Sequence, residues 1–196
     1  MGWSCSWVAV KGAAADEVLA ALDLVETGQE ALPGARSAPM CYRMRPDGWL
    51  ILFSEDFDWA ERAKVLELSR FGMTVGCQFE DKVEMTSVAT CAEAGVELWR
   101  VFHVNDPLYR LDVSGEPPPV YAGIREAHIR EQDEDGGEDS NADFIHDVPL
   151  ELAKAACGYR ADEDEAVFKG LRFASGRALR PSSGLLGSFL AIFRRR

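Results

Sequence analysis

The chain has 196 residues, of which 47% are hydrophobic, enough to build the core of one globular domain. Its formal net charge is -12, from 21 Lys and Arg against 33 Asp and Glu. Phosphate binding needs a basic surface, so this charge argues against nucleic acid as a partner and favours a basic protein.

The five cysteines are Cys5, Cys41, Cys77, Cys91 and Cys157, and no two of them form a C-x-x-C pair. An odd, dispersed set predicts neither a disulfide framework nor a zinc ribbon, and reduced thiols fit a cytoplasmic protein. The N-terminus lacks the pattern of a signal peptide, and no apolar run reaches the length of a membrane-spanning helix. We therefore expect a cytoplasmic protein that binds no metal or cofactor and has no membrane partner.

A strand and a helix are predicted at the start of the chain. "WSCSWVAVKG" (3–12) combines aromatic and β-branched residues before a glycine, which is typical of a buried strand. Apolar residues three and four apart then predict an amphipathic helix that begins near Asp16 and ends at Gly28. The prolines and glycine of residues 30–39 indicate a loop.

Residues 40–54 have the pattern of a β-hairpin. Pro-Asp-Gly at 46–48 favours a turn, because proline presets its backbone angle and glycine tolerates positive φ. Asp56 or Asp58 can cap the next predicted helix, which spans residues 59–72.

Four consecutive strands are predicted between Met73 and Gly115, where the connections are too short for parallel crossovers. Two helices follow, over residues 120–132 and 147–158. The sequence therefore predicts an α+β fold with a mainly antiparallel sheet, a meander, and several helices packed on it. We expect a single domain over residues 1–165 and a basic, partly apolar tail over 166–196.

Charge is unevenly distributed near the C-terminus. Residues 126–165 hold 14 acidic and 3 basic residues, whereas residues 166–196 hold 7 basic residues and no acidic ones. The acidic segment could be a solvated loop, could contact the basic tail, or could bind a basic partner. The segment that starts at Asp133 does not match the pattern of a calcium-binding loop, because its glycines fall at the fourth and fifth positions and Glu138 occupies the sixth.

Residues of the acidic segment are the predicted electrostatic contacts for a basic partner, and nearby aromatic residues are apolar anchors if they are exposed. The predicted contacts are Asp133, Glu134, Asp135, Glu138, Asp139, Asp143 and Asp147, with Trp49, Phe57 and Trp59 as the anchors. If the aromatic residues are buried, they belong to the core instead.

Recognised catalytic and nucleotide-binding motifs are absent from the sequence, including G-x-G-x-x-G, G-x-x-x-x-G-K-[ST] and G-x-S-x-G. One alternative is an enzyme in which Cys77 and His103 act as nucleophile and base, although a buried apolar role also suits this cysteine. Another is a peripheral membrane or scaffold protein that acts through "GLLGSFLAIFRRR" (184–196). The sequence leaves the oligomeric state open.

Several segments share a texture with a known kind of protein: "SCSWVAVKG", "DGWLILF", "GCQFEDKVEMTS", "LDVSGEPPP" and "FIHDVPLELAKAACGY". Over most of residues 3–160 they resemble small bacterial proteins found beside polymorphic toxins, where they serve as immunity proteins. The resemblance implies a non-enzymatic protein that occludes the active site of a cognate toxin and carries no catalytic residues. The basic tail is not part of that pattern. Negative charge suits such an inhibitor, since complementary potentials raise the association rate with a basic enzyme.

Overall fold

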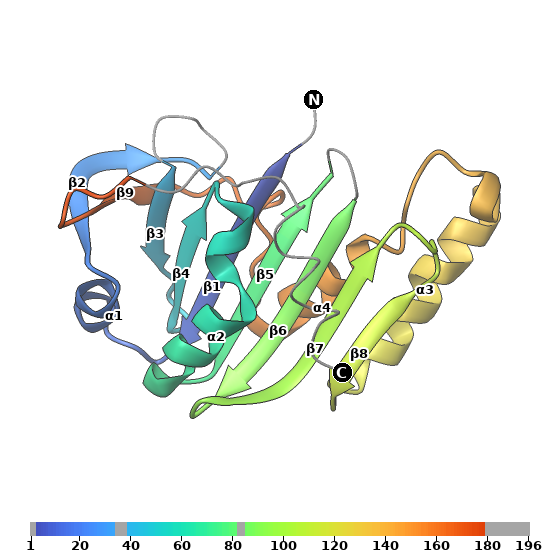
Figure 1. Cartoon of the computed structure of the whole chain (residues 1–196), viewed down its shortest axis with the longest axis horizontal. Helices are drawn as coiled ribbons and strands as arrows, with labels where there is room; N and C mark the ends of the chain where they lie inside the picture. Colours follow the sequence, from blue (N-terminus) through green and yellow to red (C-terminus); the bar gives the residue numbers. More distant parts are fainter. Residues whose placement is uncertain (1–2, 34–38, 82–84, 179–196) are drawn as a thin grey trace.

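The computed structural model describes residues 3–33, 39–81 and 85–178. Within them, nine strands form one antiparallel sheet in the order β2-β9-β3-β4-β1-β5-β6-β7-β8 (Figure 1). The strands are β1 (Ser4–Lys11), β2 (Leu24–Ala31), β3 (Met40–Met44), β4 (Trp49–Ser54), β5 (Thr74–Glu80), β6 (Thr86–Glu93), β7 (Val96–Val104), β8 (Leu111–Gly115) and β9 (Phe168–Phe173). The helices are α1 (Ala15–Ala21), α2 (Arg62–Leu68), α3 (Val120–Glu134) and α4 (Asp147–Cys157), with short 3-10 turns η1 (Phe57–Ala60), η2 (Ser69–Phe71) and η3 (Gly137–Asp139). The predicted α+β class is confirmed.

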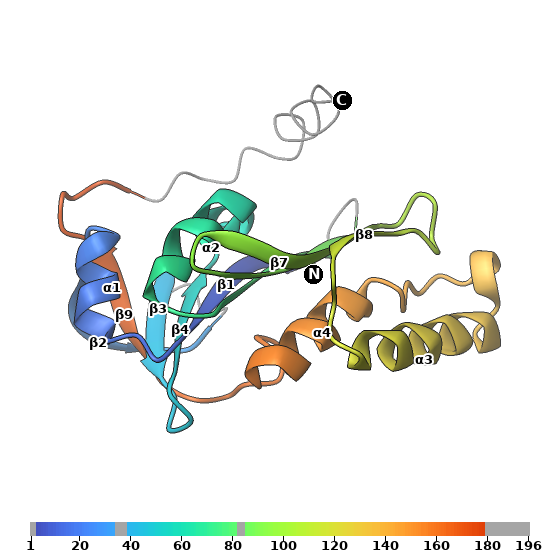
Figure 2. The same cartoon turned by 90° about the horizontal axis from the view of Figure 1, so that it is seen from below.

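Both faces of the sheet are covered by helices, as Figure 2 shows in side view: α1 and α2 lie on one face, α3 and α4 on the other. Successive strand side chains point to opposite faces, so each central strand contributes to two cores. On β1, for example, Val8 and Val10 pack toward α1 and α2, whereas Trp7 and Ala9 pack toward α4. This double coverage explains why the central strands read as continuous apolar runs.

The predicted hairpin and meander are confirmed. β3 and β4 pair around a turn in which the Gly48 N–H donates to the Arg45 carbonyl at 3.0 Å, and Gly48 takes the positive φ of 85°. β5, β6, β7 and β8 then pair in chain order, each antiparallel to the next. Helix α4 ends where predicted, because Gly158 adopts the left-handed conformation at its C-cap with a φ of 72°.

The helix predicted to run from Asp16 to Gly28 is too long, and the loop predicted over residues 30–39 starts too early. The helix α1 ends at Ala21, Asp23 takes a positive φ of 58°, and β2 begins at Leu24. This strand pairs with β9, which lies far along the chain. Local periodicity could not reveal that partner, and the long-range pairing overrides the helical pattern.

The predicted domain boundary at residue 165 is also wrong, because β9 lies inside the sheet between β2 and β3. Phe168 and Phe173 are buried in opposite cores. The domain therefore extends at least through β9. The basic, apolar segment 184–196 lies outside the described residues. None of the described helices is both long and apolar enough to cross a membrane.

Candidate interaction surface

Helix α3 lies beside the edge of the sheet (Figure 1), and its last two residues, Asp133 and Glu134, are predicted contacts. The other predicted carboxylates follow the helix in sequence. Tyr121 and Ile124 near its start pack against the core on the α4 side. Gln132 is the one residue of α3 that is fully buried. Polar contacts rather than apolar packing therefore hold the far end of the helix.

The buried amide of Gln132 organises the loop that follows α3. Its Nε2 donates to the carbonyls of Gly137 and Ala142 at 2.9 and 3.0 Å, and its Oε1 accepts from the Phe144 N–H at 2.8 Å. One uncharged side chain thus satisfies three backbone groups, as burial requires. An isolated glutamine among so many acids gave no signal in the sequence.

A second buried contact attaches this loop to the sheet. His103 on β7 is fully buried, and its Nε2 lies 2.9 Å from Oδ2 of Asp143, whose side chain is 4% exposed. The Nδ1 of His103 lies 2.8 Å from the Arg110 carbonyl. Oδ1 of Asp143 accepts from the backbone N–H of His146 at 3.0 Å. Asp143 therefore has a structural role, and its predicted role as a contact for a partner is wrong.

The ring of His146 sits next to this pair, at 6.3 Å between the centroids of His103 and His146. Its Nε2 lies 3.1 Å from the Glu80 carbonyl, and its own carbonyl accepts from the Ser87 hydroxyl at 2.7 Å. Burial lowers the pKa of His146, against smaller opposing effects that include the charge of Asp143. Burial thus favours the neutral form of this histidine in the folded protein.

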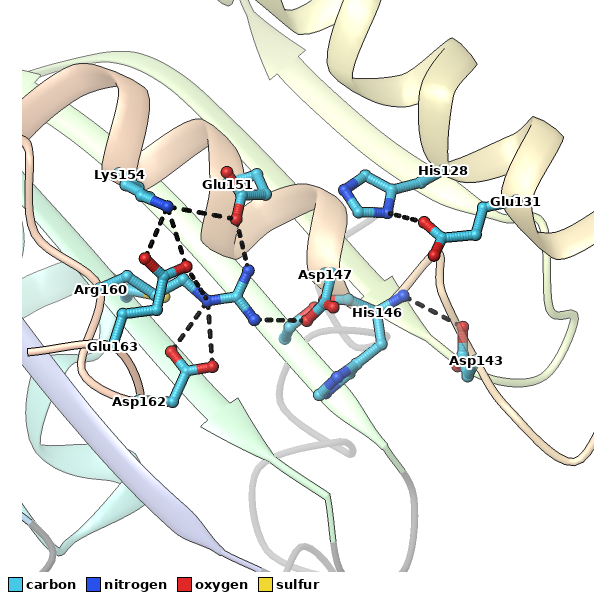
Figure 3. A network of polar contacts seen from close by, with 12 residues as sticks. His128, Glu131, Asp143, His146, Asp147, Glu151, Lys154, Arg160, Asp162 and Glu163 are labelled. Carbon is cyan, nitrogen blue, oxygen red and sulfur yellow. Dashed lines mark hydrogen bonds and ion pairs between the residues drawn. The ribbon is translucent and has the colours of Figure 1, made fainter.

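Asp147, the last predicted contact, belongs to a group of ion pairs around Arg160 (Figure 3). We call this group, which comprises Asp147, Glu151, Lys154, Arg160, Asp162 and Glu163, the Arg160 cluster. The guanidinium of Arg160 lies 2.9 Å from Asp147, 2.6 Å from Glu151 and 2.8 Å from Asp162.

The side chain of Arg160 is only 10% exposed. Burial by itself would lower the pKa of Arg160, but the hydrogen bond to Asp162 and the charges of Asp147 and Asp162 raise it. The four carboxylates of this cluster therefore share two cations, Arg160 and Lys154, within the fold.

The remaining predicted carboxylates form a distinct exposed group, which we call the acidic end. It consists of Asp133, Glu134, Asp135, Glu138 and Asp139, all of them exposed. The Tyr109 hydroxyl donates to Asp133 and the Ser140 hydroxyl to Asp135, each at 2.5 Å. The hydrogen bond to Asp133 raises the pKa of Tyr109 to about 12. Among the ion pairs of the described residues, none involves the acidic end.

The predicted aromatic anchors lie elsewhere and are largely inaccessible. Trp49 is 5% exposed and lies in the core on the α4 side, and Phe57 is 7% exposed. Trp59 is half-buried against the core on the α1 and α2 side. All three side chains therefore contribute to the packing of the protein, because the alternation of β4 and the turn η1 direct them inward. None of them is an exposed anchor.

The proposed pairing of Cys77 with His103 is not formed. Strand β6 lies between their strands, with Cys77 opposite Ala89 on one side and His103 opposite Ser87 on the other. Complete burial raises the pKa of the Cys77 thiol well above its ordinary value, which suppresses the nucleophilic thiolate. Across the part of the chain that the structure describes, no three His, Cys, Asp or Glu side chains are grouped to hold a metal ion.

The candidate site among the described residues is therefore the exposed acidic surface. Of the seven predicted acidic contacts, the structure keeps the five of the acidic end as exposed, unpaired groups and assigns Asp143 and Asp147 to the fold. Gln132 and Arg160 were not identified from the sequence. These two residues determine which carboxylates stay exposed and which are paired within the fold. No protein-family model, curated protein or solved structure matches the chain.

Proposed function

We propose that the protein is a non-enzymatic binding protein whose acidic end contacts a basic surface of another protein. In its most specific form, this partner is a bacterial toxin whose active site the protein covers, as the resemblance to immunity proteins implies. Complementary charge supports the proposal, since it accelerates encounter with a basic partner and fixes the orientation of the complex.

The observation that carries the proposal is the position of exposed carboxylates at the C-terminal end of helix α3. The C-terminus of a helix has a partial negative charge, so acidic side chains there cost stability unless a cation is nearby. Glu131, Asp133 and Glu134 occupy the last turn of α3, which contains no basic residue. Glu131 lies 3.8 Å from the ring of His128 one turn earlier, and Asp133 and Glu134 take part in no ion pair among the described residues. A basic surface that docks there would offset this unfavourable arrangement.

The experiment compares two variants of equal charge in capture from the native host at low and moderate salt. The first carries Asp133→Asn, Glu134→Gln, Glu138→Gln and Asp139→Asn. The control carries Glu30→Gln, Glu61→Gln, Glu93→Gln and Glu165→Gln, which remove four exposed carboxylates elsewhere.

We expect one stoichiometric basic protein with the wild type and the control, and at least about tenfold weaker capture with the acidic-end variant. Co-expression should then protect cells from that partner with the wild type and fail with the variant. Equal capture by both variants would remove the acidic end from the proposal, and the lack of any partner at either salt would remove binding itself.

A further inference from the structure

The two edges of the sheet differ in how they are protected. At one edge, β2 has a register shift between Glu26 and Glu30 and exposes polar and charged residues. Bulges and charges of this kind prevent another strand from pairing. At the other edge, β8 pairs with β7 in an unbroken register and exposes Val113, which is 45% accessible. Of the two edges formed by the described residues, the β8 edge is therefore the one whose geometry allows a further strand to pair.

The hydrogen-bonding pattern shows which backbone groups of β8 are available. The Glu116 N–H donates to the Leu98 carbonyl of β7 at 3.0 Å. Hydrogen-bonded and non-hydrogen-bonded pairs alternate along antiparallel strands, so Asp112 and Ser114 also direct their backbone groups toward β7. The N–H and C=O groups of Leu111, Val113 and Gly115 therefore point outward, and Leu111 and Val113 have the spacing that a tenth strand requires. The positive φ of Gly115, 69°, ends the extended stretch there.

The position of helix α3 limits what kind of strand can pair with the β8 edge. Both views place it alongside β8, on the α4 face of the sheet and extending beyond the sheet edge (Figures 1 and 2). A second copy of the chain that paired antiparallel through its own β8 would bring its own α3 to the same face of the sheet, into the space where the first α3 lies. A single extended segment does not meet this obstacle and would lie over α3.

The side chains near β8 define the chemistry of that segment. Val113 in the middle of β8 is 45% exposed, and Val120 at the start of α3 is 48% exposed, which favours apolar side chains on the helix side of the added strand. At the N-terminal end of β8, Tyr109 joins the preceding loop to Asp133 of the acidic end. Basic side chains are favoured there.

We propose that β8 receives an extended segment of the basic partner as a tenth strand, with apolar residues over α3 and basic residues beside the acidic end. This inference rests on the proposed function and specifies how the partner docks. Backbone hydrogen bonds would supply the pairing, and the side chains of α3 and the acidic end would select the sequence, as in other cases of strand addition.

The test uses a capped heptapeptide with valines at the positions that face α3 and lysines at the end that lies beside the acidic end, and a peptide with glutamates in place of the lysines is the charge control. Amide hydrogen exchange is followed by NMR on the full chain. We expect exchange at Leu111 and Val113 to slow at least about tenfold with the lysine peptide, while Asp112 and Ser114 change little. The lysine peptide with N-methyl groups on alternate residues should lose the effect.

Two variants separate backbone pairing from side-chain contact. Val113→Pro removes one outward N–H and leaves the β7 pairing intact, as edge strands tolerate, so peptide protection should disappear. Val113→Ala keeps the N–H and should keep the pattern of protection.

Peptide binding without slower exchange at Leu111 and Val113 would overturn strand addition. Loss of that binding in the acidic-end variant would then leave the proposed function intact. Unchanged capture of the host partner by the acidic-end variant would instead contradict the proposed function.

Discussion

The Arg160 cluster and the acidic end contain similar numbers of carboxylates. In the Arg160 cluster the carboxylates form ion pairs within the fold, whereas among the described residues those of the acidic end do not. In the Arg160 cluster, four carboxylates surround a guanidinium that is 10% exposed, and Lys154 adds a second cation. At the acidic end, five carboxylates are exposed and take part in no ion pair among the described residues. The comparison teaches that an acidic composition alone does not locate a binding surface, because folding neutralises part of it.

The largest expected effect comes from removing the cation of the Arg160 cluster. Arg160→Met leaves Asp147, Glu151 and Asp162 close together without their common donor, and we expect a loss of about 2–3 kcal/mol in the free energy of unfolding. The partial exposure of the carboxylates keeps the loss below that of a fully buried pair. Urea denaturation measures it.

The matched control for that variant is Arg110→Met, because Arg110 forms an ion pair with Asp112 in which both side chains are about half exposed. Exposed pairs contribute roughly 0–1 kcal/mol, so the control should change stability little. Equal losses in the two variants would show that the Arg160 cluster is no more important to the fold than a surface pair.

The next effect concerns the buried contact that holds the loop of the acidic end. Asp143→Ala removes the acceptor for His103 and for the His146 N–H, and we expect a loss of about 2 kcal/mol in the free energy of unfolding. Amide exchange in the loop around Ala142 should accelerate. Asp139→Ala, at an exposed position, should change stability by less than about 0.5 kcal/mol, and a similar loss there would contradict the structural role of Asp143.

Stability should also depend on pH through His146. Its pKa is lowered in the folded protein, so the unfolded chain takes up the proton first as the pH falls below about 6.5. The free energy of unfolding is therefore expected to decrease from about pH 6.5 downward, until the folded form is also protonated. His146→Gln should flatten this part of the curve in denaturant titrations at several pH values. An unchanged slope would exclude His146 as its origin.

The smallest effect is an increase in stability. Glu134→Gln removes a negative charge from the C-terminal turn of α3, and we expect a gain of about 0.3–0.5 kcal/mol at low salt that shrinks as salt is added. Asp16→Asn removes a negative charge from the first turn of α1 and should change stability in the opposite direction. A loss of stability in Glu134→Gln would show that this carboxylate supports the fold rather than a partner.

Local patterns in the sequence were sufficient where neighbours along the chain decide the structure. The Pro-Asp-Gly turn, the meander from β5 to β8 and the Gly158 stop of α4 each depend on residues close in sequence, and each was predicted correctly. β2 and β9 were missed because each depends on the other across the length of the domain. The position of a strand in a sheet is a tertiary property that short-range periodicity does not contain.

The candidate surface shows the same difference between what the sequence reveals and what only the folded chain reveals. Composition placed the carboxylates in one segment, but only the folded chain showed that Arg160 neutralises some of them and that His103 buries another. It also showed that Trp49 and Phe57 lie in the cores.

The sequence by itself determined the α+β class, the order of most elements, the strong negative charge and the absence of a recognised catalytic motif. The tertiary structure decided which carboxylates remain exposed, which edge of the sheet stays open and how α3 lies beside it. The physical reason is that charge and hydrophobic pattern belong to residues, whereas burial, ion pairing and strand partners arise from contacts between residues far apart in the chain.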